Sequence, residues 1–167
     1  GQQIIALELG ARRALLDEGI EEASRSAVDR MRAEDAPILG QIEAFIEAND
    51  LIDSNVVGAL NSNIAFYRGL SEGGAFPEAL TEEEMLRDVW GQEPDIREET
   101  ETWLYSYLGL AYQLLSDEDL DAYIAFSRTE TGGALNRALF AAFDRMFVDI
   151  SVALGRGAAQ FIGGQEL

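Results

Sequence analysis

The apolar residues of this chain recur three and four positions apart along nearly its whole length, and no segment alternates apolar with polar side chains. That spacing gives each segment the apolar stripe of an α-helix and leaves no candidate β-strand. Ala, Leu and Glu, which favour helices, dominate the composition, whereas Val and Thr are scarce. The sequence therefore predicts an all-α fold.

The chain of 167 residues is long enough to bury one hydrophobic core without a disulfide bond or a structural metal. No linker rich in Pro or Ser divides it. We therefore expect a single all-helical domain over residues 1–167, a bundle of about seven helices with short connections. Two of the longest helices are expected at residues 3–32, with a bend or interruption at Gly19, and at residues 134–162.

Two local signals predict where helices begin and end. Thr81 and Glu84 have the spacing of a capping box, in which each side chain accepts a hydrogen bond from the other residue's backbone N–H group. The glycine pairs Gly73-Gly74 and Gly132-Gly133 are expected to end the helices that precede them, because glycine readily adopts the conformation of a helix C-cap.

Two segments of the chain also share a short sequence. Ile64-Ala65-Phe66-Tyr67-Arg68 recurs as Ile124-Ala125-Phe126-Ser127-Arg128, and Gly-Gly-Ala follows each copy within a few residues. A duplicated helical hairpin, over residues 50–76 and 110–135, explains the match, as does chance combined with shared capping rules. The shared residue identities favour the duplication.

Missing residue types exclude most catalytic chemistry. The chain has no Cys, no His and no Lys, so all twelve of its cationic side chains are Arg. It therefore lacks a thiolate nucleophile, an imidazole base or metal ligand, a Schiff-base lysine and the lysine of a phosphate-binding loop. We expect no enzymatic activity, no catalytic residue, no metal and no cofactor.

The net charge of −19 restricts the partners of the chain. It repels the phosphate backbone of nucleic acids, and the arginines form no basic stripe with interleaved aromatic residues. No run of 18 apolar residues is present, so we expect no membrane insertion. The expected partner is an unknown protein or a second copy of the chain.

The segment from Trp103 to Leu115 is apolar on nearly every side when it is drawn as a helix. Such a helix belongs in the centre of a bundle. Its aromatic side chains carry polar tips that need partners, so they also suit the wall of an apolar ligand pocket. Both interpretations stay open, and the candidate pocket residues are Trp103, Tyr105, Tyr107 and Tyr112.

The last expected helix carries two apolar stripes instead of one. Two stripes give a wider apolar face than a surface helix needs, unless the helix is buried between neighbours or against another subunit. An intramolecular core and a dimer interface both explain this width. One stripe contains Leu139, Phe143, Met146 and Ile150, and the other, our candidate interface, contains Phe140, Phe147, Leu154 and Phe161 at seven-residue spacing.

Acidic residues offer a third, weaker kind of site. Asp117, Asp119 and Asp121 have the spacing that begins a calcium-binding loop. The rest of that loop is missing, because Ala122 stands where Gly is needed and Arg128 where a bidentate Glu is needed. We interpret the three aspartates as an acidic first helical turn, and other carboxylate pairs as solvated helix faces.

The second copy of the shared sequence carries a resemblance to a known family. Leu115–Phe126, with its acidic helix start, resembles a bacterial exported family called domain of unknown function 2059. Phe126, Thr129 and Gly132 fit the family's pattern, whereas Ser127 and Glu130 replace its usual Tyr and Pro. The resemblance covers residues 98–161 and implies an all-helical fold and export to the periplasm. It supplies no catalytic residue.

Three functions are consistent with these observations. The first is a non-enzymatic module of the bacterial cell envelope, periplasmic or secreted, that binds a protein partner or itself. The second is a carrier of a small apolar ligand, with its pocket beside the aromatic helix. The third and weakest is a carboxylate-based metal or hydrolase site.

Overall fold

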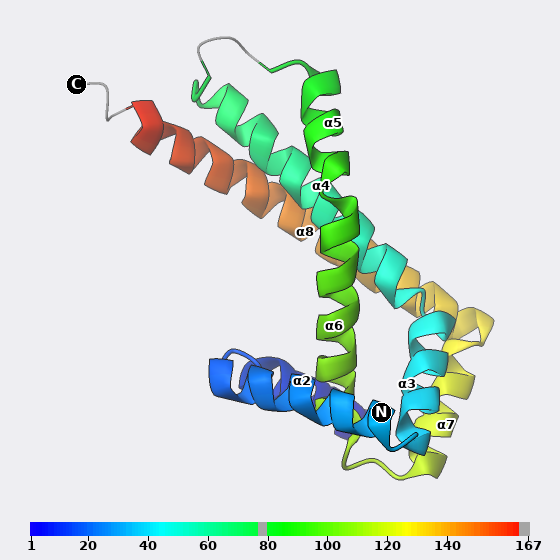
Figure 1. The fold of residues 1–167 in the computed structure, drawn as a ribbon. Helices are drawn as coiled ribbons and strands as arrows, with labels where there is room; N and C mark the ends of the chain where they lie inside the picture. Colours follow the sequence, from blue (N-terminus) through cyan, green and yellow to red (C-terminus); the bar gives the residue numbers. More distant parts are fainter. Residues whose placement is uncertain (77–79, 164–167) are drawn as a thin grey trace. The chain divides into compact units, whose positions relative to one another are not determined.

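The computed structural model describes residues 1–76 and 80–163, and every regular element within them is an α-helix (Figure 1). This confirms the predicted fold class. The described residues form eight helices instead of about seven: α1 (Gln2–Ala14), α2 (Glu18–Ala33), α3 (Pro37–Ala48), α4 (Leu51–Glu72), α5 (Glu82–Gly91), α6 (Glu93–Tyr112), α7 (Asp117–Ser127) and α8 (Glu130–Gly163).

The additional helix arises because the single helix expected at residues 3–32 is wrong. The Asp17 carboxylate accepts hydrogen bonds from the backbone N–H groups of Gly19, at 2.9 Å, and Ile20, at 3.3 Å. These bonds satisfy N–H groups that have no partner at a helix start, so Asp17 caps α2 and separates it from α1. The interruption lies just before Gly19, where the sequence predicted a bend or break.

Contacts group the chain into two compact units, each built from two separate segments. Unit 1 contains Gly1–Ile52 and Glu98–Asn136, and unit 2 contains Asp53–Arg97 and Arg137–Leu167. Helices α1, α2, α3 and α7 and most of α6 belong to unit 1, while α5 and most of α4 and α8 belong to unit 2. The description of the chain as one domain with an internal repeat stays a prediction.

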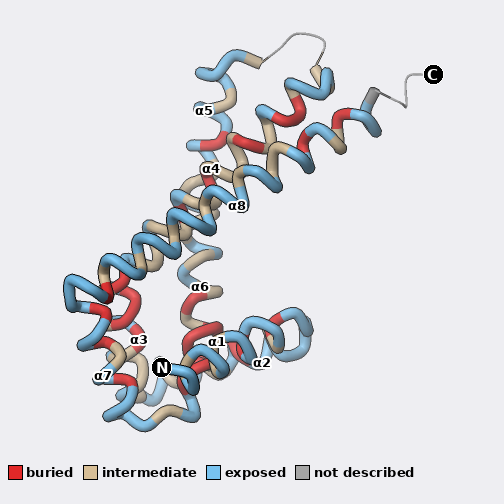
Figure 2. Tube along the Cα trace, turned by 180° about the vertical axis from the view of Figure 1, so that it is seen from behind, coloured by how far each residue is buried: buried red, intermediate tan, exposed pale blue. Residues whose placement is uncertain are grey.

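Helix α6 supplies the centre of unit 1, as its all-round apolar sequence predicted. Phe45 from α3 packs edge-on against the buried Tyr112 ring, with 5.5 Å between the ring centroids. Figure 2 shows buried segments along α3 and the second half of α6. The buried α6 residues are Leu104, Ser106, Tyr107, Leu108, Gly109, Ala111 and Tyr112.

The two glycine pairs have different roles. At the end of α4, Gly74 has a φ of 77° and the Ala75 N–H group donates to the Leu70 carbonyl oxygen at 3.0 Å, as expected of a C-cap. The same expectation is wrong for Gly132 and Gly133, because α7 ends at Ser127 and both glycines lie in the first turn of α8.

Close approach between α7 and α8 explains why glycine stands at position 132. A Cβ atom at Gly132 would lie 2.1 Å from the Phe126 carbonyl oxygen. The Thr129 hydroxyl oxygen accepts a hydrogen bond from the Gly132 N–H group at 3.0 Å and so caps the start of α8. The glycines that follow the two copies of the shared sequence therefore serve different structural purposes.

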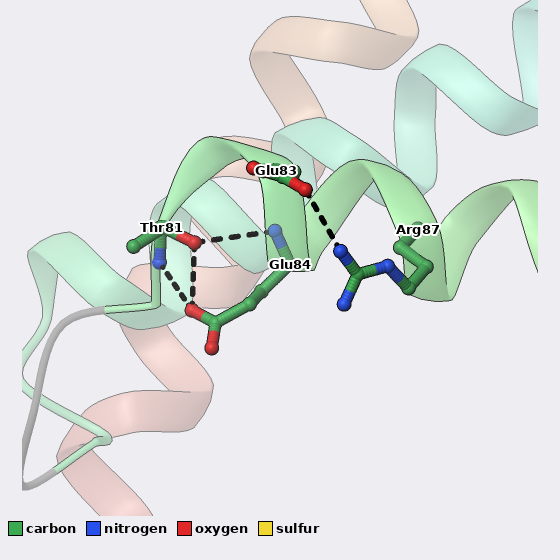
Figure 3. A network of polar contacts seen from close by, with 4 residues as sticks. All are labelled: Thr81, Glu83, Glu84 and Arg87. Atoms are coloured by element: carbon green, nitrogen blue, oxygen red, sulfur yellow. Dashed lines mark hydrogen bonds and ion pairs between the residues drawn. The ribbon is translucent and has the colours of Figure 1, made fainter.

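The predicted capping box is confirmed at the start of α5 (Figure 3). The Glu84 N–H group donates to the Thr81 hydroxyl at 3.2 Å, and the Thr81 N–H group donates to the Glu84 carboxylate at 2.9 Å. One turn later, Arg87 pairs with Glu83 at 2.8 Å on the same exposed helix.

Candidate functional site

Helices α4 and α8 lie side by side in unit 2 and run in the same direction (Figures 1 and 2). Near one end of the pair, the Asn61 side-chain amide donates to the Asp144 carboxylate at 2.9 Å. Farther along, Arg156 Nη2 lies 2.6 Å from Glu72 Oε2. These two cross-links fix the register between the helices.

Glycine allows the two backbones to touch between those cross-links. A Cβ atom at Gly69 would lie 2.3 Å from the Val152 carbonyl oxygen, and one at Gly73 would lie 2.4 Å from the Ala159 Cβ. Gly155 meets α4 in the same way, and Ala159 is almost fully buried. Small residues at four-residue spacing on both helices therefore form the contact, as in other closely packed helix pairs. The side of α8 that faces α4 is consequently its small-residue side.

Seven large apolar residues of α8 lie on the other side of the helix and are exposed to solvent. Their exposed fractions range from 43% for Met146 to 80% for Phe161. We call this surface the α8 apolar face and define it by Leu139, Phe143, Met146, Phe147, Ile150, Leu154 and Phe161.

Three of the four predicted interface residues belong to this face, and Phe140 is half-buried at its edge. The rings of Phe143 and Phe147 stack on each other at 6.4 Å between centroids, so part of the face is preorganised. Most residues of the predicted dimer interface are therefore not buried by other parts of the chain. Whether another subunit binds there stays a prediction.

The α8 apolar face carries no charged side chain. At about 100° per residue, the positions between its members are filled by Ala153 and Gly157, while Asp149 and Arg156 lie along one edge. From Leu139 to Phe161 the face is about 33 Å long, at 1.5 Å per residue. About a quarter of the residues in the chain are charged, so this face differs from the average composition of the chain.

Three of the four predicted pocket residues pack against arginine side chains, and two of these three also pack against each other. Trp103 and Tyr107 stack at 4.9 Å, and the Arg12 guanidinium from α1 lies 5.6 Å from the centroid of each ring. The Tyr105 ring meets Arg32 from α2 at 5.1 Å. These cation–π contacts attach α1 and α2 to α6.

The remaining predicted pocket residue, Tyr112, forms a polar contact inside unit 1. Its hydroxyl donates to the Glu8 carboxylate at 2.8 Å. Burial and the neighbouring Glu8 charge raise the pKa of Tyr112, and the same two causes raise the pKa of Tyr123 to about 12. Both phenols are therefore neutral at physiological pH. A ligand pocket formed by the four aromatic residues stays a prediction.

Sequence reasoning missed Glu8 and Arg12, which carry the polar contacts of this aromatic group. They lie four residues apart and so share a face of α1. That spacing was the available signal, but charged residues at this spacing are common on solvated helices, and only the fold brings these two to α6.

A separate open groove of about 410 Å³ lies between α3 and α7 in unit 1. The side-chain amide of Gln41, one of the residues that line this groove, donates to the Asp117 carbonyl oxygen at 3.1 Å and to the Asp121 carboxylate at 2.9 Å. The other atom of that amide, Oε1, is buried and has no hydrogen-bond partner among the described residues. The groove is lined by Pro37, Gly40, Gln41, Ala44, Asp121, Ile124, Ala125 and Arg128, and by none of the predicted pocket residues.

The three spaced aspartates lie in the first two turns of α7. The Ser116 hydroxyl accepts a hydrogen bond from the Asp119 N–H group at 3.2 Å and caps the helix, with Asp117 and Asp119 in its first turn. Within residues 1–76 and 80–163, no three acidic side chains converge in a way that could hold a metal ion.

Two further findings concern the chain as a whole. None of the helices in the described part of the chain combines the length and apolarity that a membrane span requires. Comparisons with protein-family models, with curated proteins and with solved structures find no match. The resemblance of residues 98–161 to an exported bacterial family stays a prediction.

Proposed function

We propose that this protein is a non-enzymatic association module and that its α8 apolar face binds a second copy of the chain. The observation that carries the proposal is that α8 contacts α4 through its small residues and leaves its large apolar residues exposed. A helix normally buries its large apolar side. The reverse arrangement leaves an apolar surface that another chain can cover.

The size of the face supports a stable pair. Its seven residues expose roughly 740 Å² in total, at about 200 Å² for each fully exposed residue. That area is close to the contribution of one partner to an interface of standard size, about 800 Å². The largest apolar patch on a typical monomer is smaller, about 300–600 Å².

The α8 apolar face carries no charge of its own, which favours contact between two identical copies of this acidic chain. Two chains that each carry a net charge of −19 repel one another at long range, but the contacting surface adds no like charges at short range. Added salt screens the repulsion and should strengthen self-association. Salt would instead weaken the binding of a basic partner protein. The sign of the salt effect therefore distinguishes self-association from binding of such a partner.

We place this activity in the bacterial periplasm as part of the same proposal. This placement rests on the resemblance of residues 98–161 to an exported family and on no feature of the α8 face. Fractionation of cells that express the natural gene product tests it, and recovery of the protein solely from the cytoplasm would contradict it.

Sedimentation equilibrium tests the association itself. We expect the wild type to sediment at twice the 18.3 kDa mass of the chain at micromolar concentration. Replacing Phe147 and Leu154 by Gln should shift the protein to monomer without loss of helicity, because both exposed side chains lie near the middle of the length of the face and would be covered by the other copy.

A matched control is available in unit 1, where Leu16 and Leu114 are 84% and 74% exposed. Replacing these two by Gln removes a similar amount of exposed apolar surface and should leave the dimer intact. A wild type that remains monomeric at about 100 μM, a concentration at which interfaces of standard size are occupied, would overturn the proposal.

A further inference from the structure

We infer that the two copies pair antiparallel along α8, around a two-fold axis that passes beside residues 151 and 152. This inference rests on the proposed function and specifies the geometry of the dimer. Its support is the order of large and small residues along α8, together with the side chains on the two edges of the α8 apolar face.

The seam residues of α8 follow the alternating four- and three-residue spacing of a coiled coil. Their sizes are distributed unequally along the helix. The first four are large and the last three are smaller or polar: Leu139, Phe143, Met146 and Ile150, followed by Ala153, Gly157 and Gln160.

An antiparallel pair places large residues of one copy opposite small residues of the other. In the inferred register, Ile150 faces Ala153 of the other copy, and Met146 faces Gly157 of the other copy. Phe143 faces Gln160, whose methylenes can cover the ring. Close packing favours this alternation of sizes across an interface.

A parallel pair does the opposite. It places Gly157 against Gly157 and Ala153 against Ala153, which leaves voids in one half of the seam, and it crowds Phe143 against Phe143 in the other half. Unfilled volume and overpacking both destabilise an interface. The size order therefore selects the antiparallel pair.

The edges of the face fit the same register. Phe147 lies beside Leu154 of the other copy, and Phe140 beside Phe161 of the other copy, so both apolar edge pairs are covered. On the opposite edge, Asp149 of each copy lies beside Arg156 of the other. A parallel pair would instead place Asp149 beside Leu154 and leave the carboxylate against an apolar side chain.

The contacts within each copy are compatible with this arrangement. The Arg156 side chain remains 58% exposed while it pairs with Glu72, so it can accept a second carboxylate. Asp149 is exposed and has no ion-pair or hydrogen-bond partner in the described part of the chain. Helix α4 occupies the small-residue side of α8, so the other copy can bind without displacing it.

Cysteine cross-linking tests the direction of the pair, because the chain contains no native Cys. We would prepare Phe143→Cys and Gln160→Cys separately and treat each variant, and their mixture, with a short bis-maleimide. In the antiparallel pair the two positions adjoin across copies. Each position lies about 25 Å from its own counterpart, at 1.5 Å per residue, beyond the reach of the linker.

We expect a cross-linked dimer in the mixture only. Cross-linking of each variant alone, with an intact dimer by sedimentation, would show a parallel pair and overturn the inference while the proposed function stands. A monomeric wild type would overturn both. Sedimentation of each variant before cross-linking shows whether the substitution itself prevents association.

A second experiment uses the charged edge and does not alter the seam. Asp149→Arg and Arg156→Asp should each weaken homodimerisation about tenfold, because each creates two like-charge pairs per dimer. Arg156→Asp also breaks the ion pair with Glu72, so circular dichroism and the unfolding midpoint of this variant are measured first to show that α4 and α8 remain packed. A mixture of the two variants should recover wild-type affinity, since the heterodimer restores an opposite-charge pair at both sites. A mixture no tighter than the single variants would contradict the inferred register.

Discussion

Gly155 on α8 meets Gly69 on α4 through backbone atoms: a Cβ atom at Gly155 would lie 3.0 Å from the Gly69 Cα and 2.2 Å from the Phe66 carbonyl oxygen. No side chain larger than hydrogen fits at that point. This contact decides which side of α8 is buried, and so it leaves the large apolar residues on the exposed side.

Gly155→Ala should destabilise unit 2 by about 1–3 kcal/mol, because an added methyl group forces the two backbones apart. Chemical denaturation, followed by circular dichroism, measures this change. Gly58→Ala on α4 is the matched control, since a Cβ there meets nothing within 4 Å. It should stabilise the fold by up to about 1 kcal/mol through helix propensity. Equal effects at the two positions would refute the close contact.

Asp35 and Asp50 each follow the end of a helix with positive φ angles of 49° and 50°. Left-handed backbone is strained for residues with a Cβ atom, at about 1–2 kcal/mol, although Asp tolerates it better than most. Replacing either residue by Gly should therefore raise the midpoint of thermal unfolding. Asp29→Gly, inside α2, should lower it by the ordinary cost of glycine in a helix. A fall in the midpoint for all three variants would contradict the assigned backbone conformation.

The Thr81 hydrogen bonds hold the pKa of Glu84 below its ordinary value of 4.5. A carboxyl group with a lowered pKa in the folded state stabilises the fold above the pKa of the unfolded state, and this contribution is lost as the pH falls through the folded value. Thr81→Ala should raise the Glu84 pKa towards 4.5 and reduce this dependence, whereas Thr81→Ser should preserve both. Carboxyl-carbon NMR titration checks the shift, and an unchanged Glu84 pKa in Thr81→Ala would exclude the capping role.

The raised pKa values of Tyr112 and Tyr123 predict alkaline unfolding of unit 1. Both phenols are neutral in the folded state, so their contribution to stability is complete below their ordinary pKa of 10.0. This contribution to stability is lost as the pH rises above 10. For Tyr123, the loss continues as the pH approaches about 12, the pKa of this residue in the folded state. Tyr123→Phe removes one of the groups and should move the transition to higher pH in circular dichroism. A transition at the wild-type pH in this variant would show that Tyr123 does not contribute.

Several features of this fold could be predicted because they depend on neighbouring residues alone. The capping box at Thr81, the glycine cap at Gly74 and the buried character of α6 each follow from residues within a few turns of one another. The sequence left open whether the segment of residues 3–32 bends or breaks near Gly19, because the apolar spacing continues across Asp17 while its carboxylate caps a new helix. There, a local hydrogen bond outweighs periodicity.

The candidate site shows where periodicity is insufficient. The sequence by itself determined that α8 is a helix with more apolar surface than one contact needs, and it determined the residues that form this surface. Only the tertiary structure decided which side is covered. Gly69 and Gly73 from a distant segment permit contact at backbone distance with Gly155 and Ala159, a fit that the larger side chains of α8 cannot make. Steric complementarity between separate helices is a property of the pair, so neither helix reveals it alone.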